Sequence, residues 1–180
     1  MLSRRLPRPV LLGATVLVVV AAVAAVVILR RDDGPERPSA ADVRALAVEG
    51  LADGTAVELG DVIDGRPAVV NFFAGWCQPC REEMPAFEVV HQELQDDVAF
   101  LGIVGPGEKP EESRRIVAET RVTYPTFTDP TGEATSLFEA LMLPTTAFVD
   151  ADGDVVDVQL AKFDEAALRD EIAEQLGVAV

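Results

Sequence analysis

Cysteine, histidine and basic side chains are scarce in this chain of 180 residues. A structural zinc site takes four nitrogen or sulfur ligands, and the two cysteines and the single histidine provide too few. The 15 Lys and Arg residues are outnumbered by 31 Asp and Glu residues, which gives a net charge of −16. Nucleic acids and anionic membrane surfaces bind clusters of Lys and Arg. The composition therefore argues against a zinc site and against nucleic acid as a partner.

Long hydrophobic runs are also absent, except for one near the N-terminus. Residues 10–29 carry no charged side chain and are rich in Val, Ala and Leu, and about 20 apolar residues in a helix cross a hydrocarbon core of about 30 Å. Three arginines precede the run and favour a cytoplasmic N-terminus, although two more follow it. We predict a cytoplasmic segment at residues 1–9 and a transmembrane helix at 10–29. A cleaved signal peptide is the alternative, but its hydrophobic region is usually shorter, about 7–15 residues.

The remainder of the chain has the pattern of one α/β domain behind a polar linker. Residues 30–45 contain two prolines and several charges, which is typical of a tether. The domain itself is expected at residues 46–180. The expected strands are 46–49, 55–59, 68–74, 98–104, 126–128, 145–150 and 154–160. The first expected helix runs from the cysteines to about Gln95 and is kinked at Pro85. Three more helices are expected: one that begins at Pro110, one over residues 133–141, and one from Asp164 to Gly177. Alternating strands and helices predict a central sheet covered by helices.

The cysteine pair lies between a buried strand and an amphipathic helix, in the segment Trp76-Cys77-Gln78-Pro79-Cys80. This spacing places Cys77 at the exposed N-terminus of the helix and Cys80 one turn further along. Amide groups and the helix dipole stabilise a thiolate there and lower its pKa from about 8.5. Cys77 would attack a disulfide, and Cys80 would resolve the mixed disulfide. A structural disulfide across so small a loop would add little stability, so the pattern indicates redox chemistry.

The segment NFFAGWCQPC, from Asn71 to Cys80, is followed by REEMP and resembles the active-site segment of the TlpA/ResA-like branch of the thioredoxin family. The resemblance extends from about Leu46 to the last helix, and residues 105–121 with the strand after them resemble the additional helix and strand of that branch. It implies a thioredoxin-like fold with a central mixed sheet flanked by helices. It also implies a membrane-anchored thiol–disulfide oxidoreductase that needs no metal or organic cofactor.

Four positions take substrate-binding roles from this resemblance. Pro144, in the segment Leu143-Pro144-Thr145-Thr146, resembles the cis-proline that faces the cysteine pair. The backbone of Leu143 and Pro144 would form hydrogen bonds with an extended substrate peptide. The alternative is that Pro144 is an ordinary trans-proline at the start of a strand. Trp76 would shield the disulfide and, with Pro79, contact apolar parts of a partner.

Two further positions take roles in proton transfer. Asn71 occupies the position where ordinary thioredoxins have a buried aspartate that handles the proton of the resolving thiol. An amide cannot act as that base. A purely structural role as a buried amide is equally compatible with the sequence. Glu83 lies three residues beyond Cys80, on the same helix face. A carboxylate there would raise the pKa of the Cys80 thiol and could carry its proton. The alternative is that Glu83 is a solvated charge beside Glu82. His91 is expected to be a half-exposed helix residue without a catalytic role.

The resemblance further implies a domain on the outer face of the cytoplasmic membrane that reduces protein disulfides. A membrane thiol carrier would supply electrons, and an apocytochrome c would be a typical substrate. An oxidase that introduces disulfides is the alternative within redox chemistry, because the sequence does not fix the reduction potential. A peroxidase is disfavoured, because those relatives use a differently spaced cysteine with a nearby Thr. A chaperone or a copper-handling binding module is the alternative outside redox chemistry.

Overall fold

The computed structural model of the chain describes residues 38–180. The expected cytoplasmic segment 1–9, the transmembrane helix 10–29 and the first part of the tether lie outside the described residues. Within 38–180, none of the helices combines the length and the apolar character needed to cross a bilayer.

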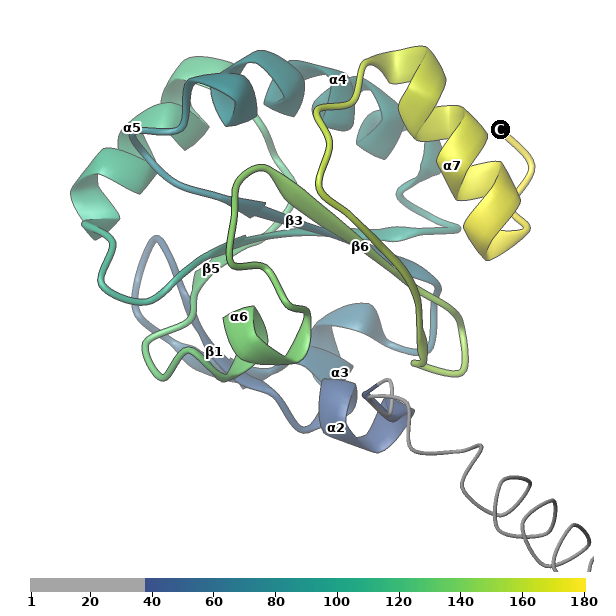
Figure 1. Cartoon of the computed structure of the whole chain (residues 1–180), viewed down its shortest axis with the longest axis horizontal. Helices are drawn as coiled ribbons and strands as arrows, with labels where there is room; N and C mark the ends of the chain where they lie inside the picture. Colours follow the sequence, from purple (N-terminus) through teal and green to yellow (C-terminus); the bar gives the residue numbers. More distant parts are fainter. Residues whose placement is uncertain (1–37) are drawn as a thin grey trace, which may run out of the picture. The chain divides into compact units, whose positions relative to one another are not determined.

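A single seven-stranded mixed sheet forms the centre of the domain, in the order β2-β1-β5-β4-β3-β6-β7 (Figure 1). The central strand β3 pairs in parallel with β4, and β4 with β5, whereas the other neighbours pair antiparallel. The strands are β1 (Ala47–Gly50), β2 (Ala56–Glu58), β3 (Ala68–Phe73), β4 (Ala99–Val104), β5 (Thr126–Thr128), β6 (Thr145–Val149) and β7 (Val155–Gln159). The predicted central mixed sheet is confirmed.

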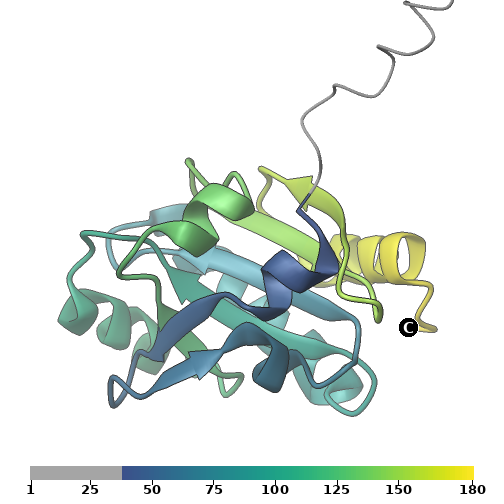
Figure 2. The ribbon, with the colours of Figure 1, turned by 90° about the horizontal axis from the view of Figure 1, so that it is seen from below.

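Six helices cover the two faces of this sheet in the described part of the chain. They are α2 (Ala40–Arg44), α3 (Leu59–Ile63), α4 (Gln78–Leu94), α5 (Pro110–Thr120), α6 (Glu133–Leu137) and α7 (Glu165–Leu176). Helices α4, α5 and α7 lie on one face and α2, α3 and α6 on the other (Figure 1). Figure 2 shows the ribbon from the side of the second group.

Two hydrophobic cores result, one on each face of the sheet. Strand β3 is buried over its whole length, as its apolar run, interrupted only by Asn71, predicts. Successive side chains of a strand point to opposite faces, so Val69 and Phe73 enter the core under α4, and Val70 and Phe72 enter the other core. Asn71 is on the α4 face because it shares the parity of Val69 and Phe73.

The start of the domain was predicted too late in the sequence. The tether expected at 30–45 does not extend to residue 45, because residues 40–44 form α2. Ser39 caps this helix and forms a capping box with Asp42, and Val43 is fully buried in the core beneath the sheet. The polar composition concealed a helix that Val43 attaches to the core and that the backbone N–H of Ala40 joins to Asp154 by a hydrogen bond.

Two other elements differ from the sequence predictions. Helix α3 was not predicted, and it begins at Leu59, where strand 55–59 was expected to end. Helix α6 ends at Leu137 rather than at residue 141, and element ends are where local sequence patterns are weakest. The helix predicted after the cysteines is confirmed as α4, which contains Pro85.

Replacing Val43 with Ala tests whether α2 belongs to the folded domain. We expect Val43→Ala to lower the free energy of unfolding by about 2 kcal/mol, because it leaves a cavity in a closed core. Val89→Ala removes the same atoms from a side chain that is 39% exposed, and it should change stability by less than about 0.5 kcal/mol. Urea unfolding of the detergent-solubilised chain measures both. Equal small effects would contradict the packing of α2.

Candidate functional site

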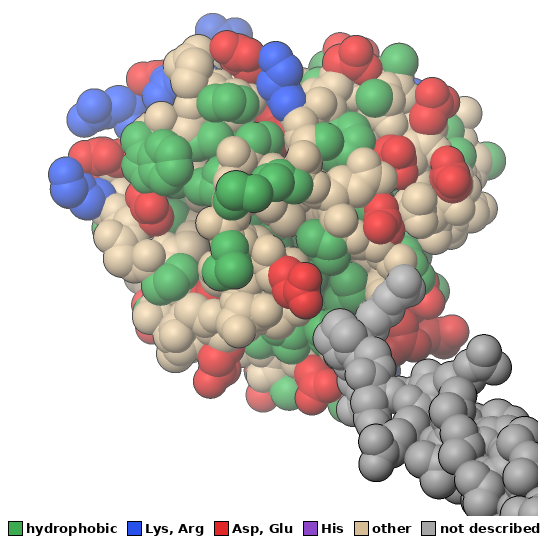
Figure 3. Space-filling view, viewed as in Figure 1, with side chains coloured by type: hydrophobic (Ala, Val, Ile, Leu, Met, Phe, Trp, Pro, Cys, Tyr) green, Lys and Arg blue, Asp and Glu red, His purple; other side chains and the backbone are tan. Residues whose placement is uncertain are grey.

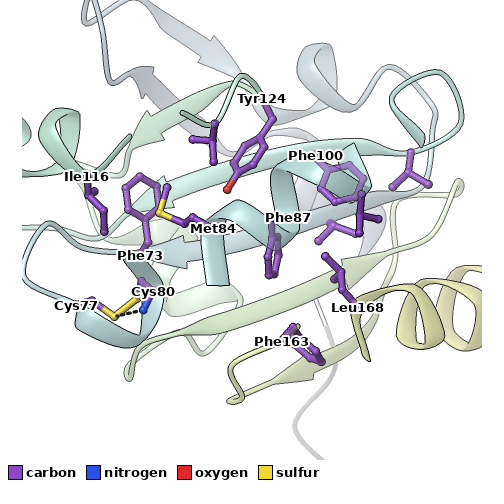
Figure 4. Packing of buried hydrophobic residues seen from close by; sticks show 14 of the residues in the cluster. Phe73, Cys77, Cys80, Met84, Phe87, Phe100, Ile116, Tyr124, Phe163 and Leu168 are labelled. Carbon is purple, nitrogen blue, oxygen red and sulfur yellow. Dashed lines mark hydrogen bonds between the residues drawn. A yellow bond between two sulfur atoms is a disulfide. The ribbon is translucent and has the colours of Figure 1, made fainter. Parts of the chain in front are cut away.

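The two cysteines form a disulfide at the N-terminus of α4, with their Cα atoms 5.3 Å apart. Cys77 is the N-cap residue of this helix, and its Sγ accepts a hydrogen bond from the backbone N–H of Cys80 at 3.2 Å. Figure 4 shows this bond and the disulfide beside Phe73 and the other core side chains under α4. A thiolate formed on Cys77 would meet the same backbone donor.

Cys77 is less accessible than the sequence suggested. We expected it to be exposed, but in the disulfide form it is 2% exposed, and Cys80 is fully buried. The reason is that both cysteines pack into the hydrophobic core with Phe73 and Ala74. The exposed residues of the segment are instead Trp76, Gln78 and Pro79.

The turn between β3 and α4 depends on a glycine. The backbone N–H of Cys77 donates to the carbonyl of Ala74 at 3.0 Å, which closes the turn. A Cβ on Gly75 would lie 2.6 Å from the carbonyl carbon of Glu112, at the start of α5. Only glycine fits at this distance from a backbone, so the turn is held directly against α5.

The Leu143-Pro144 peptide bond is cis, as the resemblance implied. Strand β6 begins directly after it, and its first residue, Thr145, pairs with Phe72 of β3. The Thr145 hydroxyl donates to the carbonyl of Met142 at 2.6 Å. Leu143 contacts both cores and is only partly buried.

Apolar side chains are exposed around this end of the sheet. Trp76 is 65% exposed, Leu141 82% and Met142 61%, and the three line one hollow of about 260 Å³ together with Leu143. Figure 3 shows hydrophobic side chains gathered on the face seen in Figure 1, with acidic side chains around them. Exposed apolar surface of this kind is typical of sites that bind other proteins.

Glu83 is buried, not solvated. It is 1% exposed, and its Oε1 accepts a hydrogen bond from the side-chain amide of Asn71 at 2.8 Å. Its Oε2 accepts from the backbone N–H of Phe163 at 3.2 Å. Burial raises the pKa of Glu83 to about 7, against the opposing effect of these two hydrogen bonds. The structure thus joins Asn71 to Glu83, and the helix places Glu83 on the face of Cys80.

The neighbouring Glu82 differs from Glu83 in both its exposure and the direction of its pKa shift. It is exposed and forms an ion pair with Lys162 at 2.8 Å. The hydrogen bond from Lys162 holds the pKa of Glu82 below its usual value. Two adjacent carboxyl groups therefore have different protonation behaviour because α4 turns one inward and the other outward.

Thr146 is a polar residue of this site that the sequence analysis missed. It pairs with Asn71 across β3 and β6, so both side chains are on the face of α4. The Thr146 hydroxyl and Oδ1 of Asn71 are buried, and neither has a hydrogen-bond partner within residues 38–180. The alternation of residues 145–150 could have placed Thr146 on this face, but it could not have identified Asn71 as the neighbour.

His91 has the position predicted for it. It is half-buried near the C-terminal end of α4, and its ring lies 5.5 Å from that of Phe100 and 5.7 Å from that of Tyr124. Burial lowers the pKa of His91. In the part of the chain that the structure describes, no three His, Cys, Asp or Glu side chains are grouped to hold a metal ion.

Curated relatives match part of the chain. The chain is 34% identical over 98 residues to the thioredoxin-like protein YneN of Bacillus subtilis, covering 53% of this chain and 57% of that protein. It is 26% identical over 120 residues to the thiol-disulfide oxidoreductase ResA of Oceanobacillus iheyensis, covering 67% of this chain and 62% of that protein. The chain thus spans about six-tenths of the length of these relatives.

Solved structures match the fold more completely. A DsbF homologue from Corynebacterium diphtheriae superposes with a TM-score of 0.64 at 28% identity, covering 79% of this chain and 89% of that one. The structure of MTB DsbF in mixed oxidized and reduced forms gives a TM-score of 0.66 at 25% identity, covering 74% and 97%. The model of the AhpC/TSA family matches residues 40–158, from α2 to the last strand. The chain therefore belongs to the AhpC/TSA family, with a thioredoxin-like fold.

Proposed function

We propose that this protein is a thiol–disulfide oxidoreductase whose cysteine pair alternates between dithiol and disulfide. The observation that carries the proposal is the Cys77–Cys80 disulfide at the N-terminus of α4, where a backbone N–H already donates to Cys77 Sγ. The names of ResA and DsbF among the similar proteins support the same activity.

The reaction requires two thiol–disulfide exchanges. The Cys77 thiolate attacks one sulfur of a substrate disulfide, so that a mixed disulfide forms and the first substrate thiolate leaves. The Cys80 thiolate then attacks Cys77 Sγ, which releases the second substrate thiolate and closes the Cys77–Cys80 disulfide. Two electrons pass from the protein to the substrate. A separate reductant must return the pair to the dithiol.

Asn71 and Glu83 serve the second exchange. Cys80 must lose its proton before it attacks, and it is buried where solvent cannot take the proton directly. Glu83 has a pKa raised to about 7 by burial, so near neutral pH its carboxylate can accept a proton and release it again. Asn71 holds that carboxylate through its side-chain amide.

Substrate binds over Trp76, Pro79, Leu143 and Pro144 in this proposal. Trp76 and Pro79 belong to the cysteine segment, and Trp76 and Leu143 line the same hollow. Exposed Trp76 supplies apolar contact area. The residues preceding β6 offer backbone groups to an extended substrate segment.

We infer that the protein acts as a reductant, following the TlpA/ResA-like resemblance. Equilibrating the Cys77–Cys80 pair with glutathione buffers measures its reduction potential. A reductant should be fully reduced only in strongly reducing buffer, with a potential nearer that of thioredoxin, about −270 mV, than that of DsbA, about −120 mV. A potential near the DsbA value would identify a disulfide-introducing oxidase instead.

We further propose that a single transmembrane helix at residues 10–29 holds the domain on the extracytoplasmic side of the membrane. The uncharged run and the arginines before it support this. A membrane thiol carrier would donate electrons there, and an apocytochrome c is the proposed substrate. Alkaline phosphatase fused after Val180 should be active in intact cells, because it folds only outside the cytoplasm. The same fusion without residues 1–31 should be inactive, and equal activity of the two would contradict the proposal.

A further inference from the structure

The single tryptophan of the chain is hydrogen-bonded to a distant acidic side chain. The indole Nε1 of Trp76 donates to both carboxylate oxygens of Glu108, at 3.0 and 2.9 Å. Glu108 lies 32 positions further along the chain, in the loop between β4 and α5. Gly107 precedes it with a φ of 79°, a conformation that glycine adopts readily. This loop therefore presents Glu108 toward the cysteine segment.

Two further contacts join the same segment to α5. The backbone of Gly75 packs against Glu112 so closely that a Cβ would not fit. Arg81, in the first turn of α4, donates to the carbonyl of Gly75 at 3.3 Å and forms an ion pair with Glu119 of α5. The backbone before Cys77 is thus fixed by α5, whereas the Trp76 side chain beyond it is fixed only by Glu108 among the hydrogen bonds of the described residues.

Without Glu108 the indole would have freedom to move. A side chain that is 65% exposed has few packing neighbours to select one rotamer. A bifurcated hydrogen bond from the single indole N–H to one carboxylate restricts both its side-chain torsions. Trp76 and Glu108 also line the hollow that contains Leu141, Met142 and Leu143, so the orientation of the indole decides the shape of that hollow.

We propose that Glu108 is a positioning residue, which holds the Trp76 indole as one wall of the substrate-binding hollow. The inference rests on the proposed function, because it assigns Glu108 a part in disulfide exchange. Glu108 does not contact the sulfur atoms; it acts through Trp76. Binding a substrate against an indole that is already fixed costs less conformational entropy than binding against an indole that must first be ordered.

Fluorescence provides a direct test, because Trp76 is the only tryptophan. In Glu108→Ala we expect a lower fluorescence anisotropy and about a twofold higher acrylamide quenching constant, since the indole is no longer restrained. The kcat/KM for reduction of insulin by the full-length detergent-solubilised protein should fall about fivefold. Glu108→Gln retains one acceptor oxygen and should restore most of the rate and anisotropy.

Controls separate this role from a general effect of the loop. Glu111 lies three positions after Glu108, is exposed and does not bind Trp76. Glu111→Ala removes the same charge as Glu108→Ala, and it should match the unmodified protein in both measurements. In a Trp76→Phe background, Glu108→Ala should change kcat/KM no further. Equal anisotropy and rate in Glu108→Ala and Glu111→Ala would overturn the inference. If the unmodified protein reduces no disulfide, the proposed function fails, while the anisotropy still decides whether Glu108 holds Trp76.

Discussion

Cys77→Ser should lower the rate of protein disulfide reduction at least about a thousandfold. Without Cys77 no sulfur at the N-terminus of α4 can attack the substrate. Cys80→Ser should also stop turnover, but for a different reason, because Cys77 still attacks and the mixed disulfide is not resolved. We therefore expect Cys80→Ser, and not Cys77→Ser, to accumulate covalent complexes with its partners. Insulin reduction and non-reducing electrophoresis measure the two effects.

The two variants control for each other. Both lose the Cys77–Cys80 disulfide and any stability that it contributes, so a difference between them reports on chemistry and not on folding. Circular dichroism should show the same unfolding temperature for both. A chaperone or a copper-handling module would bind its partners without a covalent bond, so the absence of mixed disulfides with Cys80→Ser would favour that class of protein. Metal analysis of the reduced chain tests the copper alternative.

Glu83→Gln should remove a pH dependence of stability. In the folded protein the pKa of Glu83 is about 7, raised from 4.5 by burial. Between these pH values the folded state holds a proton that the unfolded state has lost, so the free energy of unfolding must fall as the pH rises. The loss amounts to about 3 kcal/mol across this window, since each pKa unit corresponds to about 1.4 kcal/mol. Urea unfolding of the oxidised protein at several pH values measures it.

The difference between the unmodified protein and Glu83→Gln isolates this effect, because the other titrating groups cancel. We expect the unmodified protein to lose about 3 kcal/mol relative to Glu83→Gln between about pH 4.5 and 7. Glu82→Gln is the matched control. The pKa of Glu82 is lowered by its hydrogen bond with Lys162, so its contribution changes below this window and its curve should run parallel to that of the unmodified protein. A parallel curve for Glu83→Gln would contradict the assignment.

The same substitution should also slow the second exchange. A glutamine cannot accept the Cys80 proton, so we expect reduction of insulin at pH 7 to slow about tenfold to a hundredfold. The limb of the pH–rate profile near pH 7 should disappear, and mixed disulfides should become detectable. An unchanged profile would leave Glu83 a structural residue.

Much of the site follows from neighbouring residues alone. The almost unbroken apolar run of β3 and the two-residue spacing of the cysteines place Cys77 and Cys80 on the first turn of a helix. Both features are local, because strand and helix periods operate over a few residues. The cis bond before Pro144 came instead from resemblance to a family, since local patterns do not specify it.

Burial was the property that the sequence predicted least well. Cys77 was expected to be exposed and is buried, and Glu83 was compatible with either state. Whether a helix residue faces a core depends on what packs over it, and Glu83 is covered by the segment of Phe163, 80 positions away. The buried Val43 similarly turned an apparent tether into part of the domain.

The sequence by itself determined the class of fold, the cysteine pair and its position at a helix N-terminus, because short-range periodicity and spacing suffice for these. Only the tertiary structure decided that Asn71 binds Glu83, that Thr146 pairs with Asn71, and that the Trp76 indole binds Glu108. Each of these contacts joins residues from different elements, and the long-range packing that brings such elements together also sets their burial and protonation.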